Sequence, residues 1–289
     1  MKKHLHLIFL VSLLLSSLNS YGQENVYQTF KDTRVINSHT VETVPERKLD
    51  FRIGHRFGET NGGWNTLWGL ENATDVLFGF ELGISDDLTL GISRTKGSGE
   101  LRALVNPSVK YRIIRQKTEG GSPVSLTLMG VGSISTMKSV DSDGSLANFG
   151  KFAHRISYTA QALIARKFSD RFSLQIMPGY THRNRVNFND VNGIFSLGAA
   201  TRIQINKVFG IIADFTMPFA DRPTESDGSR RYFAPLGIGL EIETGGHVFQ
   251  INFTNTSGII ENDYIPYTTS NWGDNEFRLG FTISRLFNL

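Results

Sequence analysis

The sequence predicts an all-β protein, a transmembrane up-and-down antiparallel β-barrel of about twelve strands. From residue 48 onward, apolar and polar side chains alternate with the period of two that is typical of strands. The links between these segments alternate strictly between brief and long ones, so that all tight turns fall at one end of the sheet. Aromatic residues gather at both ends of the strands, as they do at the two interfaces of a membrane. Transmembrane barrels combine these three features.

The start of the chain is typical of a secretory signal peptide. Lys2 and Lys3 precede a short apolar stretch at residues 7–15, and small residues lie just before Gln23. Because the apolar stretch is too short for a retained membrane anchor, we expect residues 1–22 to be removed. Residues 23–47 are polar and show no clear period, so we assign them to a periplasmic N-terminal segment and a candidate plug. The β-barrel domain then covers residues 48–289.

The strands are assigned from alternation and from the turn residues Gly, Asn, Asp and Ser between them. Glycine, β-branched and aromatic residues inside the segments disfavour helices. A short helix is expected only at residues 64–73, in the first long loop, where it is a second candidate plug. The expected strands are residues 48–58, 75–84, 88–95, 103–115, 124–137, 152–168, 172–183, 193–204, 208–219, 231–244, 247–256 and 276–288.

Composition excludes several classes of protein. The chain has no cysteine, which rules out disulfides and thiolate metal sites. Removal of the signal peptide takes away Lys2 and Lys3, so the charge balance becomes 28 − 27 = +1, and nothing favours nucleic acid as a partner. Mean hydropathy is −0.18, a value that alternating strands produce as readily as a soluble fold does. No phosphate-binding glycine loop and no zinc-ligand spacing occurs, so we expect no cofactor.

The two faces of the strands differ sharply. Alternate positions of a strand, which we call one parity, face the same side of the sheet. One parity is apolar over long stretches, as in Val76, Phe78, Phe80, Leu82 and Ile84. A soluble barrel would bury this face, whereas a membrane barrel turns it toward lipid. The signal peptide and the loop asymmetry favour the membrane arrangement. The polar parity should then line the lumen with Arg52, Arg56, Glu81, Lys110, Arg112, Arg155, Lys167, Arg202, Asp214, Glu241, Glu243 and Arg278.

The expected lumen is basic. With Asp50 and Arg183 added, the inward set holds nine basic and five acidic side chains, which predicts a preference for anions. A second interpretation stays open, since mixed charges inside small barrels often pair and fill the interior without any transport. His55, His154, His182 and His247 fall on the outward parity, so no metal site is expected in the lumen.

The last segment, "EFRLGFTISRLFNL", is apolar and strand-like to its end. Every backbone donor must be paired in lipid, so the sheet must close and this strand must pair with the first. An even number of strands places both termini on the same side, which we expect to be the periplasm.

Two stretches resemble known proteins. The terminal "FRLGFTISRLF" resembles the insertion signal of outer-membrane barrels, which implies barrel-assembly machinery as a partner during insertion. Residues 33–58, "TRVINSHTVETVPERKLDFRIGHRFG", are similar to the opening of an uncharacterised bacterial outer-membrane β-barrel family, domain of unknown function 5777. Its sharpest motif is "RVIN" followed by "DFR" and "HRF". The resemblance implies the bacterial outer membrane as the location and its lipid as the surroundings, without assigning any catalytic or binding residue.

Three functions follow as hypotheses. The first is a narrow pore or transport channel for a small anionic solute. The second is a non-conducting barrel that binds a partner through its outer loops, with Tyr264, Tyr267 and Trp272 as exposed contact residues. The solute and the oligomeric state stay open.

The third hypothesis, an outer-face lipid hydrolase built on His154 and His182, has a geometric objection. The nearby hydroxyls of Ser157 and Thr181 fall on the opposite parity, out of reach of the two imidazoles. We therefore expect no catalytic residues and no enzymatic activity.

Overall fold

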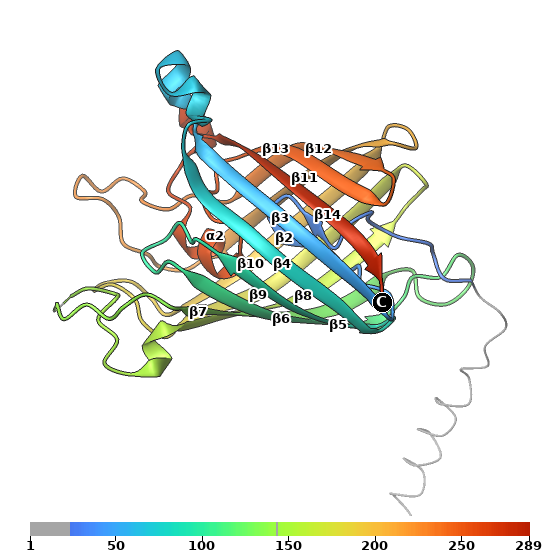
Figure 1. The fold of residues 1–289 in the computed structure, drawn as a ribbon, viewed down its shortest axis with the longest axis horizontal. Helices are drawn as coiled ribbons and strands as arrows, with labels where there is room; N and C mark the ends of the chain where they lie inside the picture. Colours follow the sequence, from blue (N-terminus) through green and yellow to red (C-terminus); the bar gives the residue numbers. More distant parts are fainter. Residues whose placement is uncertain (1–23, 143) are drawn as a thin grey trace, which may run out of the picture.

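The structure, a computed structural model, describes residues 24–142 and 144–289. The expected signal peptide, residues 1–22, lies outside the described residues. Within them, twelve antiparallel strands form a closed barrel (Figure 1). The strands are β3 (Lys48–Glu59), β4 (Ala73–Ser85), β5 (Leu88–Thr95), β6 (Leu104–Ile114), β7 (Ser125–Ser135), β8 (Ile156–Lys167), β9 (Phe172–Arg183), β10 (Gly193–Gln204), β11 (Phe209–Phe219), β12 (Leu236–Thr244), β13 (His247–Thr254) and β14 (Arg278–Asn288).

Closure occurs between the first and the last barrel strand. β14 pairs antiparallel with β3, with Ile283 opposite Ile53 and Ser284 opposite Arg52. The pairing predicted from the apolar C-terminal segment is therefore confirmed. It gives the backbone groups along both strands partners in the sheet, as a hydrocarbon environment requires.

Three expected elements differ from those observed by more than two residues at an end or in their type. Residues 231–235 are not part of β12, because Pro235 lacks the N–H that a ladder position needs. Residues 152–155 form the 3₁₀ turn η2 (Phe152–Arg155) ahead of β8. The expected helix at residues 64–73 is wrong: η1 (Thr60–Gly69) consists of 3₁₀ turns broken by non-helical backbone at Leu67 and Trp68.

The side chains are inverted relative to a soluble barrel. On the outer face, Phe78 is 52% exposed and Phe80 is 47% exposed. On the inner face, Arg56 is 0% and Lys110 is 1% exposed. An outward apolar band around a polar interior is the pattern of a transmembrane barrel. No helix in the described part of the chain is long and apolar enough to cross a membrane.

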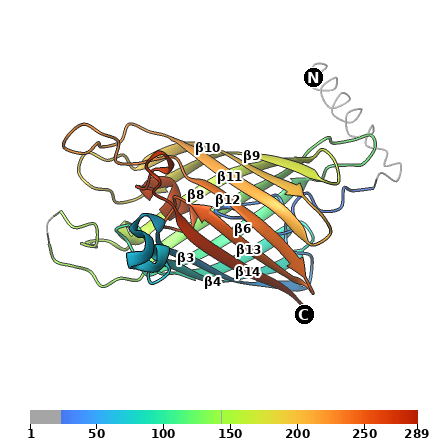
Figure 2. The same ribbon diagram turned by 90° about the horizontal axis from the view of Figure 1, so that it is seen from above.

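The connections divide between the two ends of the barrel (Figures 1 and 2). Tight turns such as Gly245-Gly246 lie at one end, which also holds the C-terminus. The opposite end carries the long loops, including η1 and the segment that holds α2 (Glu261–Tyr267) and η3 (Trp272–Asp274). We call these the tight-turn end and the loop end.

Residues 29–44, the inner segment, occupy the barrel interior. They contain the two-stranded hairpin β1 (Arg34–Val35) and β2 (Ser38–His39). The segment's apolar side chains are buried, and four of them form one cluster with inward residues of the wall. These four are Phe30, Val35, Ile36 and Val41.

The inner segment leaves the barrel at the tight-turn end. There, Val26 N–H donates to the Gln116 carbonyl over 2.9 Å and Thr118 N–H donates to the Glu24 carbonyl over 3.0 Å. This short antiparallel contact lies beside the link between β6 and β7. Residues 60–69 remain outside the barrel instead, with Trp64 73% exposed, so η1 does not fill the lumen.

Candidate functional site

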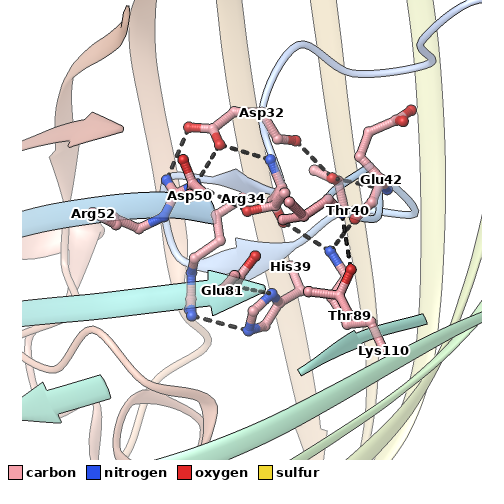
Figure 3. Close-up of polar contacts among 12 residues, drawn as sticks. Asp32, Arg34, His39, Thr40, Glu42, Asp50, Arg52, Glu81, Thr89 and Lys110 are labelled. Carbon is pink, nitrogen blue, oxygen red and sulfur yellow. Dashed lines mark hydrogen bonds and ion pairs between the residues drawn. The ribbon is translucent and has the colours of Figure 1, made fainter. Parts of the chain in front are cut away.

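The candidate site is the barrel interior, where wall side chains meet the inner segment (Figure 3). Period-two alternation in β3 directs Arg52 and Arg56 inward. Arg52 Nη1 donates to Asp32 Oδ2 over 2.8 Å, and Nη2 donates to Asp32 Oδ1. The same Nη2 lies 3.0 Å from Asp50 Oδ2. Both carboxylates and the guanidinium are buried, so this triad lies in the interior of the barrel.

Asp214 of β11 and Arg56 of β3 hold the tip of the hairpin. Asp214 Oδ2 accepts from the backbone N–H groups of Asn37 and Ser38, each over 2.8 Å. Its Oδ1 accepts from Asn37 Nδ2 over 2.9 Å. From the other side, Arg56 Nη2 donates to the Ile36 carbonyl and to Asn37 Oδ1, each over 2.9 Å. An acidic and a basic wall residue thus clamp one tight turn.

Neutral side chains of the wall satisfy the backbone of the inner segment. Gln175 of β9 accepts from Val41 N–H and donates to the His39 carbonyl, each over 2.8 Å. Gln250 of β13 donates to the Arg34 carbonyl over 2.8 Å. Thr127 of β7 donates to the Val41 carbonyl over 2.8 Å. Buried backbone groups need partners, and here the wall provides them in place of a β-ladder.

His39 lies deep in this network. Burial and the neighbouring cations Arg34 and Lys110 lower the pKa of His39 well below its ordinary value, so the ring is neutral. Arg34 Nη1 lies 3.1 Å from His39 Nε2. Because a guanidinium only donates, Nε2 accepts, and the ring proton lies on Nδ1, 3.8 Å from Glu81 Oε1.

The loop end is closed by α2. Arg34 Nη2 of the inner segment contacts Glu261 Oε1 over 3.1 Å and donates to the Ile259 carbonyl over 3.0 Å. Asp263 accepts from the backbone N–H groups of Ser98 over 2.7 Å and Gly99 over 2.9 Å. The loop of residues 257–275 is therefore folded into the mouth of the barrel, against the inner segment.

The expected exposure of the loop aromatics is wrong for Tyr264, which is 1% exposed. Burial raises the pKa of Tyr264 well above its ordinary value, so its hydroxyl stays neutral. Tyr267 is half-buried, with the Arg183 guanidinium 5.1 Å from its ring centroid. Trp272 is also half-buried and donates from Nε1 to the Leu236 carbonyl over 3.0 Å. The apolar residues of α2 turn inward because they cover the mouth of the barrel.

The predicted lumen residues have partners of two kinds. Some pair within the wall or its loops: Arg202 Nε lies 2.6 Å from Glu241 Oε1, and Arg278 Nη2 lies 2.7 Å from Glu59 Oε1. Arg155 lies at the loop end and donates to the Ser135 carbonyl over 3.1 Å. The others contact the inner segment or the residues just before it: Arg52, Arg56, Glu81, Lys110, Arg112, Lys167, Asp214 and Glu243.

Several site residues were not anticipated. Asp32 and Glu42 lie in a stretch without period, and Glu261 lies in a loop. Gln175 and Gln250 have the inward parity but are uncharged, so the pattern of inward charges does not include them. The apolar residues Val35, Ile36, Val41 and Val44 within a polar stretch were a usable signal that this stretch is buried.

The interior retains spaces of different size beside the inner segment. A cavity of about 470 Å³ lies at the tight-turn end, and its lining includes Asp32, Asp50, Arg112 and Ser284. A much smaller void of about 20 Å³ lies between Arg34, His39, Arg52 and Glu81. A void of that size holds about one water molecule.

Ser157 and His182, which an outer-face hydrolase of this kind would pair, contact other residues. Ser157 Oγ accepts from Asn262 Nδ2 of α2 over 3.2 Å, whereas the His182 ring stacks on Tyr158, its pairing partner across β8 and β9. The hydroxyl and the imidazole therefore have different surroundings. Among the described residues, no group of three or more His, Asp or Glu side chains is placed to hold a metal ion.

Comparison with known proteins gives one family match. The sequence pattern of the membrane bound beta barrel domain (DUF5777) matches residues 30–287. No curated protein matches the chain.

Several solved structures are similar to the chain in fold alone. The NanC porin has 12% identity and a TM-score of 0.47, covering 83% of this chain and 100% of its own. An outer membrane channel from Pseudomonas putida F1 has 12% identity and a TM-score of 0.46, covering 86% and 98%. An active site mutant of outer membrane phospholipase A from Escherichia coli has 11% identity and a TM-score of 0.43, covering 84% and 91%.

Proposed function

This chain belongs to the membrane bound beta barrel domain family (DUF5777), and we propose that it is an outer-membrane channel for small anionic solutes that its inner segment holds closed. One observation carries the proposal. Within the described residues, β1 and β2 pair only with each other, while the barrel closes without them. The inner segment fills the lumen through side-chain contacts, so its withdrawal leaves every strand pair of the wall intact.

The width of the barrel supports this function. A barrel of about eight strands is filled by its own inward side chains, whereas wider barrels enclose space for a ligand or a channel. Twelve strands here surround a folded hairpin in addition to the wall side chains. Removal of that hairpin would leave a lumen at least as wide as a peptide chain.

The charge of the wall supports an anionic solute. Arg52, Lys110 and Arg112 all contact acidic or carbonyl oxygens of the inner segment. Asp32 and Glu42 supply the negative charge on the segment's side. Withdrawal of the segment leaves these cations facing the lumen, where rings of basic side chains favour anions.

Planar-bilayer recording tests the proposal. We expect little conductance from the protein with its signal peptide removed, and clear anion-selective conductance from a variant that also lacks residues 24–44. If the deletion prevents folding, the double variant Asn37→Ala with Glu42→Ala replaces it. This variant keeps residues 24–44 but loses the side-chain contacts of the inner segment with Asp214 and Arg112. Deletion of residues 60–69, which lie outside the lumen, is the matched control and should leave the current unchanged. Cation-selective conductance, or no conductance from either the deletion or the double variant, would contradict the proposed channel.

One observation favours a second candidate, a binding role for the loop end. In η1, Trp64 and Trp68 are exposed and their ring centroids lie 5.1 Å apart. Figure 1 shows η1 as a blue coil that projects beyond the barrel. Exposed paired aromatics mark contact sites for partners. A binding role predicts that the deletion of residues 60–69 abolishes partner capture, while a channel alone predicts no change.

A further inference from the structure

The Asp32 carboxylate is held in the manner of a bound ligand. Arg52 of β3, Gln250 of β13 and Ser284 of β14 all converge on it, and all four residues are buried. Arg52 Nη1 donates to Oδ2 over 2.8 Å and Nη2 donates to Oδ1. Ser284 Oγ donates to Oδ2 over 3.1 Å, with Gln250 Nε2 at 3.5 Å. Three strands of the wall thus contribute donors to one carboxylate.

The geometry of these donors is selective. A guanidinium fork matches the two oxygens of a planar carboxylate, and charge-assisted pairs of this kind are among the strongest hydrogen bonds. Asp50 holds one guanidinium nitrogen of Arg52 over 3.0 Å. Arg52 therefore stays oriented if Asp32 leaves, with Nη1 available to another acceptor.

The site is reached from the tight-turn end. Asp32, Asp50 and Ser284 all line the cavity of about 470 Å³ at that end. A molecule inside this cavity therefore contacts the carboxylates of Asp32 and Asp50 directly. The lining of this cavity holds four basic and four acidic side chains, so the path to the site carries charges of both signs. The inner segment leaves the barrel at this end as well, through residues 24–26.

We propose that Arg52, Gln250 and Ser284 form a binding site for the carboxylate group of a small soluble acid, and that Asp32 occupies this site as an internal competitor. A carboxylate that enters from the tight-turn end displaces Asp32 and so loosens the inner segment from the seam between β3 and β14. This inference rests on the proposed channel and adds the chemical class of its solute and the event that opens it.

Chemical rescue of an Asp32 variant tests the site. Asp32→Ala, made in the protein without its signal peptide, removes the tethered carboxylate and leaves space in its place. The measurement is the midpoint of thermal unfolding in detergent, followed by heat-dependent migration on a gel. Acetate or formate should raise the midpoint of Asp32→Ala in proportion to the logarithm of concentration once the site begins to fill. Chloride at equal ionic strength should leave this midpoint unchanged. Acetate or formate should raise the midpoint of the unsubstituted protein less than that of Asp32→Ala.

A double variant makes the result specific. Asp32→Ala with Arg52→Gln lacks the guanidinium fork, so acetate should leave its midpoint unchanged. If Asp32→Ala does not fold, Asp32→Asn keeps the shape of the residue, and radiolabelled acetate binding to it replaces the midpoint. Equal rescue by chloride, rescue that persists without Arg52, or no effect of acetate on either variant would overturn the carboxylate site.

The outcome can be told apart from the fate of the channel. If acetate raises the unfolding midpoint of Asp32→Ala but the variant lacking residues 24–44 shows no conductance, the carboxylate site is supported and the channel is contradicted. If the variant lacking residues 24–44 conducts anions but acetate does not change the unfolding midpoint of Asp32→Ala, the channel is supported and the carboxylate site is contradicted.

Discussion

Ser284 and Arg52 lie directly opposite each other across the β14–β3 seam, and both donate to the carboxylate of Asp32. One residue comes from the last barrel strand and the other from the first. Their shared acceptor belongs to the inner segment, about twenty residues before Arg52 in the chain. The binding site for Asp32 therefore exists only once the barrel has closed, and the inner segment in turn ties the two edges of the sheet together.

Replacement of Arg52 should destabilise the barrel strongly. Arg52→Gln leaves Asp32 and Asp50 buried without their common cation. Breaking a buried pair in this way destabilises a protein by about 3–5 kcal/mol. The measurement is the free energy of unfolding in urea from detergent or lipid vesicles. Arg171→Gln, at an exposed turn, is the matched control and should change stability by less than about 0.5 kcal/mol. Equal effects of the two substitutions would contradict a structural role for the triad.

Asp214→Ala should free the tip of the hairpin. It removes the acceptor of three N–H groups, two from Asn37 and one from Ser38. Unsatisfied buried donors destabilise the closed state by about 2 kcal/mol, which is roughly a thirtyfold rise in the open fraction. The chain has no cysteine, so the single thiol of Ser38→Cys reports this opening through its rate of reaction with a water-soluble maleimide.

The thiol assay has an internal reference. Ser226→Cys lies on an exposed loop and should react quickly in both backgrounds. Accelerated labelling of Ser38→Cys alone identifies movement of the inner segment. An unchanged rate at residue 38 would mean that Asp214 does not hold the segment.

The barrel could be predicted from the sequence because successive side chains of each strand face lipid and the polar interior in turn, and the residue types alternate accordingly. The alternation in residues 172–183 and 193–204 places the observed strands β9 and β10 to the residue. The inward parity of Arg52 and Lys110 follows from the same period. A one-residue slip would turn every side chain to the wrong face, so the pattern is informative along its whole length.

The partners of those lumen charges could not be predicted from the same pattern. Asp32 and Glu42 lie in a segment whose backbone is paired by side chains such as Gln175 and Thr127 instead of by a ladder. A segment held in this way has no need of a regular period, so it resembles a polar linker in sequence. The inward fold of α2 was missed for a related reason, since a loop of mixed composition gives no parity from which to infer that Tyr264 is buried.

The pairing of Asp190 predicts a response to acid at the loop end. Asp190 Oδ2 lies 3.0 Å from Arg183 Nη1 and 2.8 Å from Arg222 Nη2. Burial opposes ionisation, but the hydrogen bonds from Arg222 and Arg183 outweigh it and hold the pKa of Asp190 below its ordinary value. A lowered folded-state pKa stabilises the fold fully above the unfolded-state value, about 3.9, and the stabilisation is lost as the pH falls through the folded-state value.

Hydrogen exchange measures this response. Backbone exchange around Arg222, corrected for the intrinsic effect of pH, should accelerate below about pH 4 as Asp190 becomes protonated. In Asp190→Asn the same region should exchange quickly at neutral pH and show no further change in acid. Protection around Arg222 that persists at low pH in the unsubstituted protein would show that another contact holds this loop.

Phe80 tests the outward direction of the apolar face. It lies in mid-strand, paired with Phe51 and Ile92, and it is exposed at the outer surface. In lipid, Phe80→Arg should destabilise the barrel by about 2–4 kcal/mol, as expected for a cation near the bilayer midplane. Phe80→Leu keeps an apolar group toward the acyl chains, so it should cost less than about 1 kcal/mol. In a dry protein core, by contrast, loss of the aromatic ring would leave a cavity. Unfolding from lipid vesicles distinguishes the two cases, because a large effect of Phe80→Leu would place this ring inside the protein.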